Sequence, residues 1–306
     1  MNDRIPQLTT SQAANILDVH ESSVKRWCGQ DELSCTYTAG GHRRISLDDL
    51  LDFAQEQGID CSLLPIRPHD ARVWRAVLQS EKKRNFPDLV DLIYTELLDP
   101  QSPYPGRILH LCRASRIPIS TLFDELIAPV LNRIGDAWSA GEIHVGDEHR
   151  MSESLIQTLA VIYDNIKAGL APTNENRPTA IVGCGEGIQH DIGARIIRIL
   201  LEESGWNAIY LGANVPTEEF AAQQTKHHAR LVCISLVPPA TAADADRTKR
   251  ILARMYDGEH PYSLILGGSG VKGYTSKAGD DPFDELTVFE DTVSFAAWAT
   301  GGKQQG

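Results

Sequence analysis

Two groups of residues in this chain carry side chains suited to holding a ligand. Trp138 is followed after nine residues by Glu148-His149, and a further histidine, His190, begins the sequence His-Asp-Ile-Gly. An indole offers a flat apolar face that can cover a ring system, and a glutamate and a histidine can form hydrogen bonds with the polar edge of a ligand. A neutral imidazole is also a strong ligand for a transition metal ion. The two groups therefore offer an apolar cover, polar contacts and a metal-binding imidazole.

The residues around His190 belong to a segment with the pattern of a doubly wound parallel sheet. Buried apolar strands that alternate with helices indicate this fold, and its ligands bind at the carboxyl ends of the strands. His190 follows the first predicted strand, Ser235 ends the third with Val237 just after it, and Gly267-Gly268 follow the fourth. These residues are therefore expected to share one edge of the sheet. We predict strands at 179–183, 208–211, 231–235, 263–266 and, with an edge position, 286–289, and helices at 190–204, 217–228, 244–257 and 291–299.

The preceding segment, residues 70–170, has a helical pattern throughout. One helix is predicted to end near Gly141 and the next to begin around Gly146, so that Trp138, Glu148 and His149 can converge on one rim. Apolar residues recur at spacings of three and four, as one buried helix face requires: Leu89, Leu92, Ile93 and Leu97, then Leu122, Leu126, Ile127, Val130, Leu131 and Ile134.

The N-terminal residues 7–58 have the pattern of a small DNA-binding domain. A helix that begins near Thr9 is followed, after a short turn, by a second helix over Glu21–Cys28. This arrangement fits a helix-turn-helix, whose second helix enters the major groove of double-stranded DNA. Its early exposed positions, among them Ser22 and Ser23, would face base edges, whereas Lys25 and Arg26 would lie near phosphates. Trp27 is expected to pack into the small core.

A basic hairpin is predicted directly after this helix pair. Gly40-Gly41 can supply the positive φ angles of a tight turn, after which His42, Arg43 and Arg44 project toward the DNA backbone. The alternative is a solvated basic hairpin without a partner. Residues 1–60 hold five Lys/Arg against ten acids, within a chain of net charge −12, but four of the five bases form two tight pairs. We therefore expect weak affinity per monomer and reliance on oligomers or tandem sites.

The bulk composition is that of a globular protein with several domains. The 306 residues are 42% hydrophobic and 23% charged. The sequence has no run of eighteen apolar residues, which predicts that no segment spans a membrane. The N-terminus lacks the apolar core of a signal peptide, which predicts a cytoplasmic protein. Six scattered cysteines are expected to be reduced structural thiols. No nucleophile with an adjacent base, phosphate loop or zinc spacing is evident, so we expect a protein that is not an enzyme. The predicted domains are 1–66, 67–173 and 174–306, joined by linkers at 62–69 and 174–178.

These motifs resemble those of one family. The distances from His-x-x-Gly to Ser-x-Val and then to Gly-Gly are similar to those in cobalamin-binding domains in which a protein histidine replaces the cofactor's own base. Trp-x9-Glu-His resembles the signature of the helical bundle that caps cobalamin in repressors of the CarH/LitR type. Gly-His-Arg-Arg-Ile resembles the wing of MerR-family regulators. The chain thus resembles, over essentially its whole length, a MerR-family cobalamin-binding transcriptional regulator.

The resemblance implies a fold and a set of roles. It implies a winged helix-turn-helix, a four-helix bundle and a Rossmann-like cobalamin-binding domain. His190 would bind the cobalt of adenosylcobalamin, or alternatively methylcobalamin, from below, and Ser235 would bond the displaced base. Gly193 would allow close approach of the backbone, Gly267-Gly268 would leave room for the nucleotide tail, and Trp138, Glu148 and His149 would cover the upper face. Cofactor binding would promote a homodimer or tetramer that represses transcription at a DNA operator, with light as a further signal.

Two departures from the family pattern keep other functions open. Light-sensing members have a histidine directly after the tryptophan, where this chain has Ser139, and relatives carry an acidic residue two positions before the axial histidine, where this chain has Ile188. Glu186, two residues earlier, could reach back. The alternatives are a cofactor-free or haem-binding antirepressor built on the same domains, or a corrinoid-carrier subunit of a methyltransferase. The basic hairpin distinguishes a regulator from a carrier.

Overall fold

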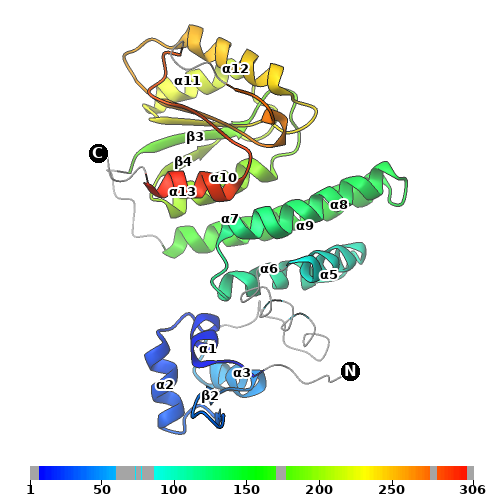
Figure 1. The fold of residues 1–306 in the computed structure, drawn as a ribbon, viewed down its shortest axis with the longest axis vertical. Helices are drawn as coiled ribbons and strands as arrows, with labels where there is room; N and C mark the ends of the chain where they lie inside the picture. The colour runs from blue at the N-terminus through cyan, green and yellow to red at the C-terminus, as the bar shows by residue number, and fades with distance from the viewer. Residues whose placement is uncertain are drawn as a thin grey trace. The chain divides into compact units, whose positions relative to one another are not determined.

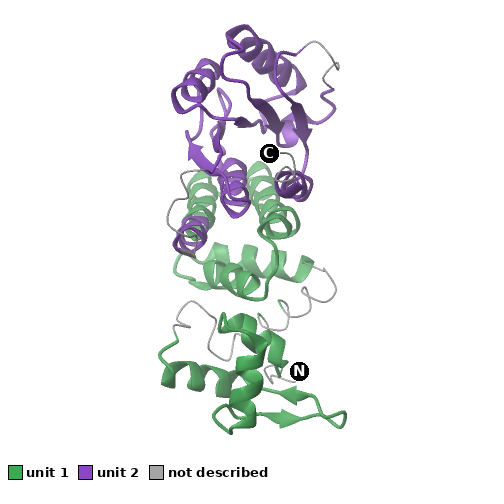
Figure 2. Cartoon of the chain, turned by 90° about the vertical axis from the view of Figure 1, so that its left-hand side faces the viewer, with its two compact units in different colours: residues 1–158 green, residues 159–306 purple. Residues whose placement is uncertain are grey.

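A computed structural model describes residues 7–59, 86–169, 177–275 and 281–301 of the chain, together with Val73 and Val77. The predicted linker at 62–69 lies outside these residues, as do most of the linker at 174–178 and both predicted domain boundaries. The chain divides into two compact units, Met1–Thr158 and Leu159–Gly306, each of which is described by itself (Figure 2).

The N-terminal unit begins with three short helices and a hairpin. The elements are α1 (Thr10–Ile16), α2 (Glu21–Gly29), β1 (Thr36–Tyr37), β2 (Arg43–Arg44) and α3 (Leu47–Glu56) (Figure 1). The hydroxyl of Thr9 accepts a hydrogen bond from the Gln12 backbone and caps α1, which fixes where that helix starts. The strands β1 and β2 pair antiparallel, and Gly41 takes a φ of +76° in the turn between them, whereas Gly40 does not adopt the left-handed region.

A small core holds these elements together. Leu8 pairs with Ile45 through two backbone hydrogen bonds, which attaches the end of the hairpin to the start of the domain. Trp27 packs its ring on Phe53 of α3 with 4.9 Å between centroids, as predicted. Buried apolar side chains complete the core: Ala13, Val24, Leu33, Leu47 and Leu50.

The second part of this unit is helical. Its elements are α5 (Pro87–Leu98), α6 (Tyr104–Ala114), α7 (Ile119–Leu122), η1 (Phe123–Ile127), α8 (Ala128–Ser139) and α9 (Val145–Gly169), the last of which continues into the C-terminal unit. The sequence pattern predicted one regular helix across 122–134, but the structure has a π turn, η1, within it. Pro129 explains this difference, because it has no N–H to donate and its ring crowds the carbonyl one turn before it.

The C-terminal unit contains a five-stranded parallel sheet. The strands are β3 (Thr179–Cys184), β4 (Asn207–Tyr210), β5 (Leu231–Ser235), β6 (Ser263–Gly267) and β7 (Leu286–Phe289), in the order β4-β3-β5-β6-β7. The helices are α10 (Ile192–Glu203), α11 (Thr217–His227), α12 (Ala242–Met255) and α13 (Thr292–Gly301), with a short turn, η2 (Ser269–Val271). Helices α10 and α13 cover one face of the sheet, and α11 and α12 cover the other (Figure 1). The predicted doubly wound parallel sheet is confirmed.

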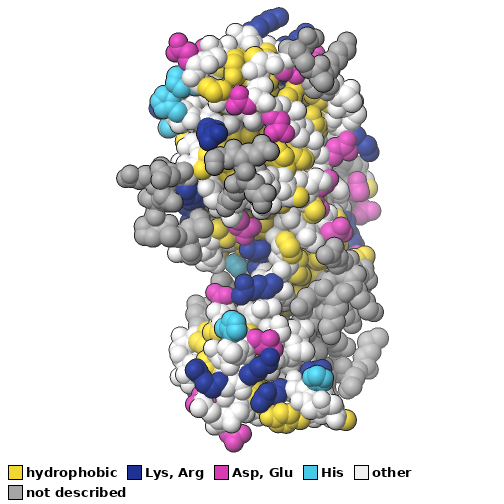
Figure 3. Space-filling model, turned by 60° about the vertical axis from the view of Figure 1, so that its left-hand side comes forward, with side chains coloured by type: hydrophobic (Ala, Val, Ile, Leu, Met, Phe, Trp, Pro, Cys, Tyr) yellow, Lys and Arg dark blue, Asp and Glu magenta, His cyan; other side chains and the backbone are white. Residues whose placement is uncertain are grey.

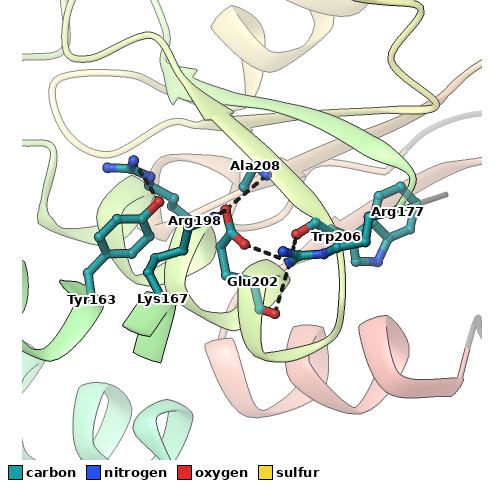
Figure 4. A network of polar contacts seen from close by, with 7 residues as sticks. All are labelled: Tyr163, Lys167, Arg177, Arg198, Glu202, Trp206 and Ala208. Atoms are coloured by element: carbon teal, nitrogen blue, oxygen red, sulfur yellow. Dashed lines mark hydrogen bonds and ion pairs between the residues drawn. The ribbon is translucent and has the colours of Figure 1, made fainter. Parts of the chain in front are cut away.

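A buried carboxylate fixes α10 within this unit. Glu202 is 1% exposed and accepts hydrogen bonds from Arg177 at 2.6 Å, from Lys167 at 3.0 Å and from the Ala208 backbone N–H at 3.3 Å (Figure 4). Because Lys167 lies in the last turn of α9 and Arg177 lies just before β3, one side chain connects three segments. A charge so buried is stable only while these partners remain.

One further contact ties α9 to α10. Arg198 donates to the Tyr163 hydroxyl at 2.8 Å, and its guanidinium lies 3.8 Å from the centre of the Tyr163 ring. The arginine therefore makes a hydrogen bond and a cation–π contact with one tyrosine (Figure 4). Together with the Lys167–Glu202 ion pair, this contact fastens the C-terminal part of α9 to the sheet domain.

The cysteines described by the structure are free thiols, and burial should make several of them, Cys28 and Cys112 among them, slow to react. Burial, assisted by a hydrogen bond with Cys35, raises the pKa of Cys28 to about 11, and burial raises the pKa of Cys112 to about 12. A raised pKa leaves less thiolate at pH 8, so we expect maleimide to modify these two thiols at least about 100-fold more slowly in the folded protein than in urea. Peptide mass spectrometry over time measures both rates. Equal rates in the folded and unfolded protein would contradict this expectation.

None of the helices within the described ranges is long and apolar enough to cross a bilayer.

Candidate functional sites

The strand order of the sheet reverses between β3 and β5. Strand β3 has β4 on one side and β5 on the other, so the connections from β3 and β5 leave toward opposite faces. Open parallel sheets bind ligands in the crevice outside the carboxyl ends of such strands. His190 lies in the loop that leaves β3, and Ser235 is the last residue of β5. The structure therefore places both residues beside the reversal point.

The side chain of His190 is exposed and available. Within the described part of the chain, no hydrogen bond or ion pair reaches its ring. Only its backbone carbonyl is contacted, by the thiol of Cys184 at 3.7 Å. An imidazole without an internal partner has a nitrogen available to bind a metal ion.

The next residue, Asp191, is held firmly. Its carboxylate is 9% exposed and accepts hydrogen bonds from the Tyr210 hydroxyl at 2.6 Å and from Arg195 Nε at 3.0 Å. Arg195 also forms an ion pair with it at 2.8 Å. Burial, followed by the hydrogen bond and the charge of Asp191, raises the pKa of Tyr210 well above its usual range, so this hydroxyl stays protonated as a donor.

Ser235 and the glycines lie on the same edge. Ser235 is buried and stands opposite Cys184 on one side and Gly267 on the other. Gly268 adopts a φ of +104°, and a Cβ there would lie 2.6 Å from the Leu236 carbonyl oxygen. The packing of the chain therefore requires a glycine at 268, whatever space a ligand needs. Val237 and Gly193 are half-buried near this edge, in the loop after β5 and in the first turn of α10.

The structure explains what position 188 does in this chain. Ile188 is 1% exposed, and its backbone is fixed by hydrogen bonds with Gly185 and Asn214. Glu186 is exposed, and no hydrogen bond joins it to His190 among the described residues. Neither residue orients the imidazole here. The orientation of the His190 ring is therefore not set by these two residues.

The second group of predicted ligand-binding residues lies where α8 and α9 meet in the N-terminal unit. Trp138 is half exposed near the end of α8, and Ser139 beside it is exposed. Glu148 and His149 lie in the first turns of α9 and contact each other through their side chains. An exposed indole has an apolar face available for a ligand, unlike the core tryptophan that is usual at a helix end.

Trp138 and His190 belong to different units, so their predicted pairing around one ligand stays a prediction.

The recognition helix α2 presents polar side chains. Ser22, Lys25 and Arg26 are exposed and Ser23 is half-buried. Glu21 accepts a hydrogen bond from the Thr10 hydroxyl at 2.6 Å and forms an ion pair with Lys25 at 3.0 Å. These two contacts hold the pKa of the Glu21 carboxyl below its usual range. The side of α2 that is predicted to face bases thus combines hydroxyl groups with an ordered acid–base pair.

The hairpin closes a cleft against α1 and α2. Of its three basic residues His42 is exposed, while Arg43 and Arg44 are half-buried. The Arg43 guanidinium lies 5.6 Å from the centre of the Tyr37 ring. Figure 3 shows Lys and Arg side chains gathered on one face of this region, in the lowest part of the view. The cleft has a volume of about 530 Å³ and is lined by Thr9, Thr10, Ser11, Glu21, Lys25, Gly41, His42, Arg43 and Arg44.

This cleft contains residues that the sequence analysis did not assign to the site. The sequence places Thr9 only at the start of a helix, because the approach of Thr9, Thr10 and Ser11 to the hairpin depends on tertiary packing. Hydroxyl groups and the N–H groups at the start of a helix suit phosphate oxygens. The cleft therefore adds the side chains of Thr9, Thr10 and Ser11 to the predicted DNA-binding surface.

Three family models match parts of the chain. Residues 8–58 match a helix-turn-helix domain, and residues 106–163 and 178–296 each match a B12 binding domain. The predicted site residues of the sheet domain lie within the last range, and those of α2 and the hairpin within the first. These matches support a cobalamin-binding protein with a DNA-binding helix-turn-helix domain.

The chain is also similar to characterised proteins. It is 24% identical over 163 residues to a corrinoid protein of Desulfitobacterium hafniense, covering 53% of this chain and 74% of that protein. It is 26% identical over 158 residues to the HTH-type transcriptional repressor CarH of Myxococcus xanthus, covering 52% of this chain but only half of CarH. The monomethylamine corrinoid protein of Methanosarcina barkeri shares the fold, with a TM-score of 0.50 at 17% identity over 71% of this chain and 98% of that chain.

Proposed function

We propose that this protein is a MerR-family transcriptional regulator, similar to CarH, that represses an operator in response to cobalamin. The observation that carries the proposal is the free imidazole of His190, which lies where the strand order reverses in a sheet that matches a B12 binding domain. The same chain also has a match to a helix-turn-helix domain and a cleft lined by basic residues. A regulator requires both a ligand site and a DNA site, whereas a carrier requires only the first.

The residues present fit a corrinoid. His190 would bind the cobalt, with Ser235, Val237 and the glycines at 193, 267 and 268 along the same edge. Trp138, Glu148 and His149 would contact the corrinoid as well. Adenosylcobalamin, when bound, supplies a cobalt–carbon bond that light can break. The chain's own part is to present the imidazole, to exclude water with the indole, and to couple this site to the helix-turn-helix.

We further propose that the DNA-binding form is a homodimer or tetramer. The basic cleft belongs to a chain of net charge −12, so one helix-turn-helix offers few phosphate contacts. Linking several such domains raises their effective concentration at tandem operator sites and so increases overall affinity.

Ser139 limits what light can do in this mechanism. A serine hydroxyl is a far weaker cobalt ligand than the imidazole that light-sensing relatives have at this place. We therefore propose that the presence of cobalamin is the primary signal. A light response would have to proceed without a second histidine ligand from this position.

Reconstitution in the dark tests the proposal. We expect the protein to take up adenosylcobalamin, to show corrin absorption bands, and to bind its operator as a larger species on size exclusion. His190→Ala should change the bands to those of a corrinoid without a protein imidazole. It should weaken uptake by more than the roughly 10–100-fold that loss of a contact orienting a metal ligand typically costs. His227→Ala, an exposed histidine at the end of α11, is the matched control. Absence of corrin bands with the unaltered protein would refute the proposal.

The second candidate function is a corrinoid-carrier subunit of a methyltransferase. It is favoured by the similarity to the corrinoid proteins named above. Corrin uptake without any DNA binding, by a protein that passes a methyl group to a partner, would establish it. A haem absorption band in place of a corrin band would instead identify the haem-binding antirepressor.

A further inference from the structure

The loop that carries His190 must be held by contacts other than the usual one. In the resembled cobalamin-binding domains an acidic residue two positions earlier bonds the far nitrogen of the imidazole. Ile188 occupies that position here and is buried in the core. The ring of His190 therefore receives no support from the described residues of its own loop. Its direction depends on how firmly the backbone at 190 is fixed.

The end of the neighbouring strand β4 fixes this backbone on one side. Tyr210, the last residue of β4, donates its hydroxyl to the Asp191 carboxylate at 2.6 Å. Arg195, on the next turn of α10, donates to the same oxygen, and its guanidinium lies 5.4 Å from the centre of the Tyr210 ring. Asp191, directly after His190, is thus held by hydrogen bonds from β4 and from α10.

The segment after β4 fixes the other side of the loop. The Asn214 side chain accepts a hydrogen bond from the Gly187 backbone at 2.7 Å, and the Asn214 backbone donates to the Ile188 carbonyl at 2.8 Å. The Cys184 thiol contacts the His190 carbonyl from β3. Both flanks of His190 are anchored while its side chain stays free, so the loop is built to present one imidazole.

We propose that Tyr210 is a positioning residue for His190, acting through Asp191. This inference rests on the proposed function, in which His190 binds cobalt. In relatives a carboxylate restricts the direction of the imidazole by a hydrogen bond to the ring. Here the Tyr210 hydroxyl restricts it indirectly, because its hydrogen bond to Asp191 fixes the backbone next to His190. Contacts that orient a metal ligand are commonly worth 10–100-fold in metal affinity.

The test compares Tyr210→Phe, which removes the hydroxyl bonded to Asp191, with a control variant, Tyr256→Phe. The control removes a hydroxyl that is far from the loop in sequence, on a ring packed against Tyr262 and Phe283. Both variants of the full-length chain are reconstituted with adenosylcobalamin. For Tyr210→Phe we expect about tenfold weaker uptake and an absorption spectrum shifted toward the form without a lower imidazole. Tyr256→Phe should match the unaltered protein in both.

A second readout needs no cofactor. Hydrogen exchange of the backbone amides from 185 to 191 should become faster in Tyr210→Phe, while the melting temperature changes little. A purely structural role would lower the melting temperature and weaken uptake without changing the spectrum of the corrinoid that is bound. If Tyr210→Phe does not fold, Arg195→Gln removes the other donor to Asp191 and takes its place.

The outcomes separate this inference from the proposed function. If the unaltered protein binds no cobalamin, the proposed function fails and this inference fails with it. If the unaltered protein binds cobalamin and His190→Ala loses the lower ligand, but Tyr210→Phe keeps the unaltered spectrum and affinity, then positioning by Tyr210 is refuted and the proposed function stands.

Discussion

Replacing Glu202 with alanine is expected to destabilise the C-terminal unit by about 3–5 kcal/mol, the usual cost of breaking a buried charge pair from one side. Arg177 is 15% exposed in its side chain, so removal of the carboxylate leaves a largely buried cation without its partner. Lys167 loses its partner as well. Urea unfolding followed by circular dichroism measures the free energy of unfolding, and the midpoint should fall sharply.

Two further variants serve as controls for the effect of Glu202→Ala. Glu259→Ala removes an exposed glutamate in the same unit and should change the free energy of unfolding by no more than about 0.5 kcal/mol. Glu202→Gln keeps a hydrogen-bond acceptor and should fall between the two. Equal stability of Glu202→Ala and Glu259→Ala would show that the buried network contributes nothing to folding.

The second large effect is expected at the hairpin. Replacing Arg43 and Arg44 together with alanine removes two cations from the cleft and should weaken operator binding about 100-fold, taking each charged contact as about 1.5 kcal/mol. The dependence of log affinity on log salt concentration should become shallower by about 2, because two fewer phosphates are neutralised. Fluorescence anisotropy with labelled operator at several salt concentrations measures both quantities.

Arg254→Ala, an exposed arginine on α12, serves as the control for charge alone. An unchanged salt slope in the double variant would mean that the hairpin does not contact phosphates. In that case the basic pair would have only a structural role, with the Arg43 guanidinium stacked on Tyr37.

The sheet domain could be predicted from sequence almost residue by residue. Its strands are apolar over nearly their whole length because helices cover both faces, and such runs stand out between amphipathic helices. Even the edge strand predicted at 286–289 is β7. This is also why the sequence alone could place His190 and Ser235 on one edge.

Contacts between segments distant in sequence could not be predicted. Nothing in the spacing of Asp191 and Tyr210 indicates that they meet, because the register of β4 against β3 and the start of α10 decide it together. The approach of Thr9 to the hairpin could not be predicted either, because it too depends on how segments distant in sequence pack together. The half-exposed state of Trp138 also differs from the usual state of a tryptophan at a helix end, and only packing could reveal it.

The place of α13 in the fold has a consequence for how the domain is assembled during synthesis. This helix, which buries Phe295, packs against α10, although about ninety residues of chain separate them. Strand β3 can pair with β4 and β5 as soon as these strands leave the ribosome. The surface of α10 that contacts α13 cannot be covered until α13 has been translated. Until then the residues of α10 that α13 covers stay exposed, and apolar surface exposed in this way during synthesis favours aggregation.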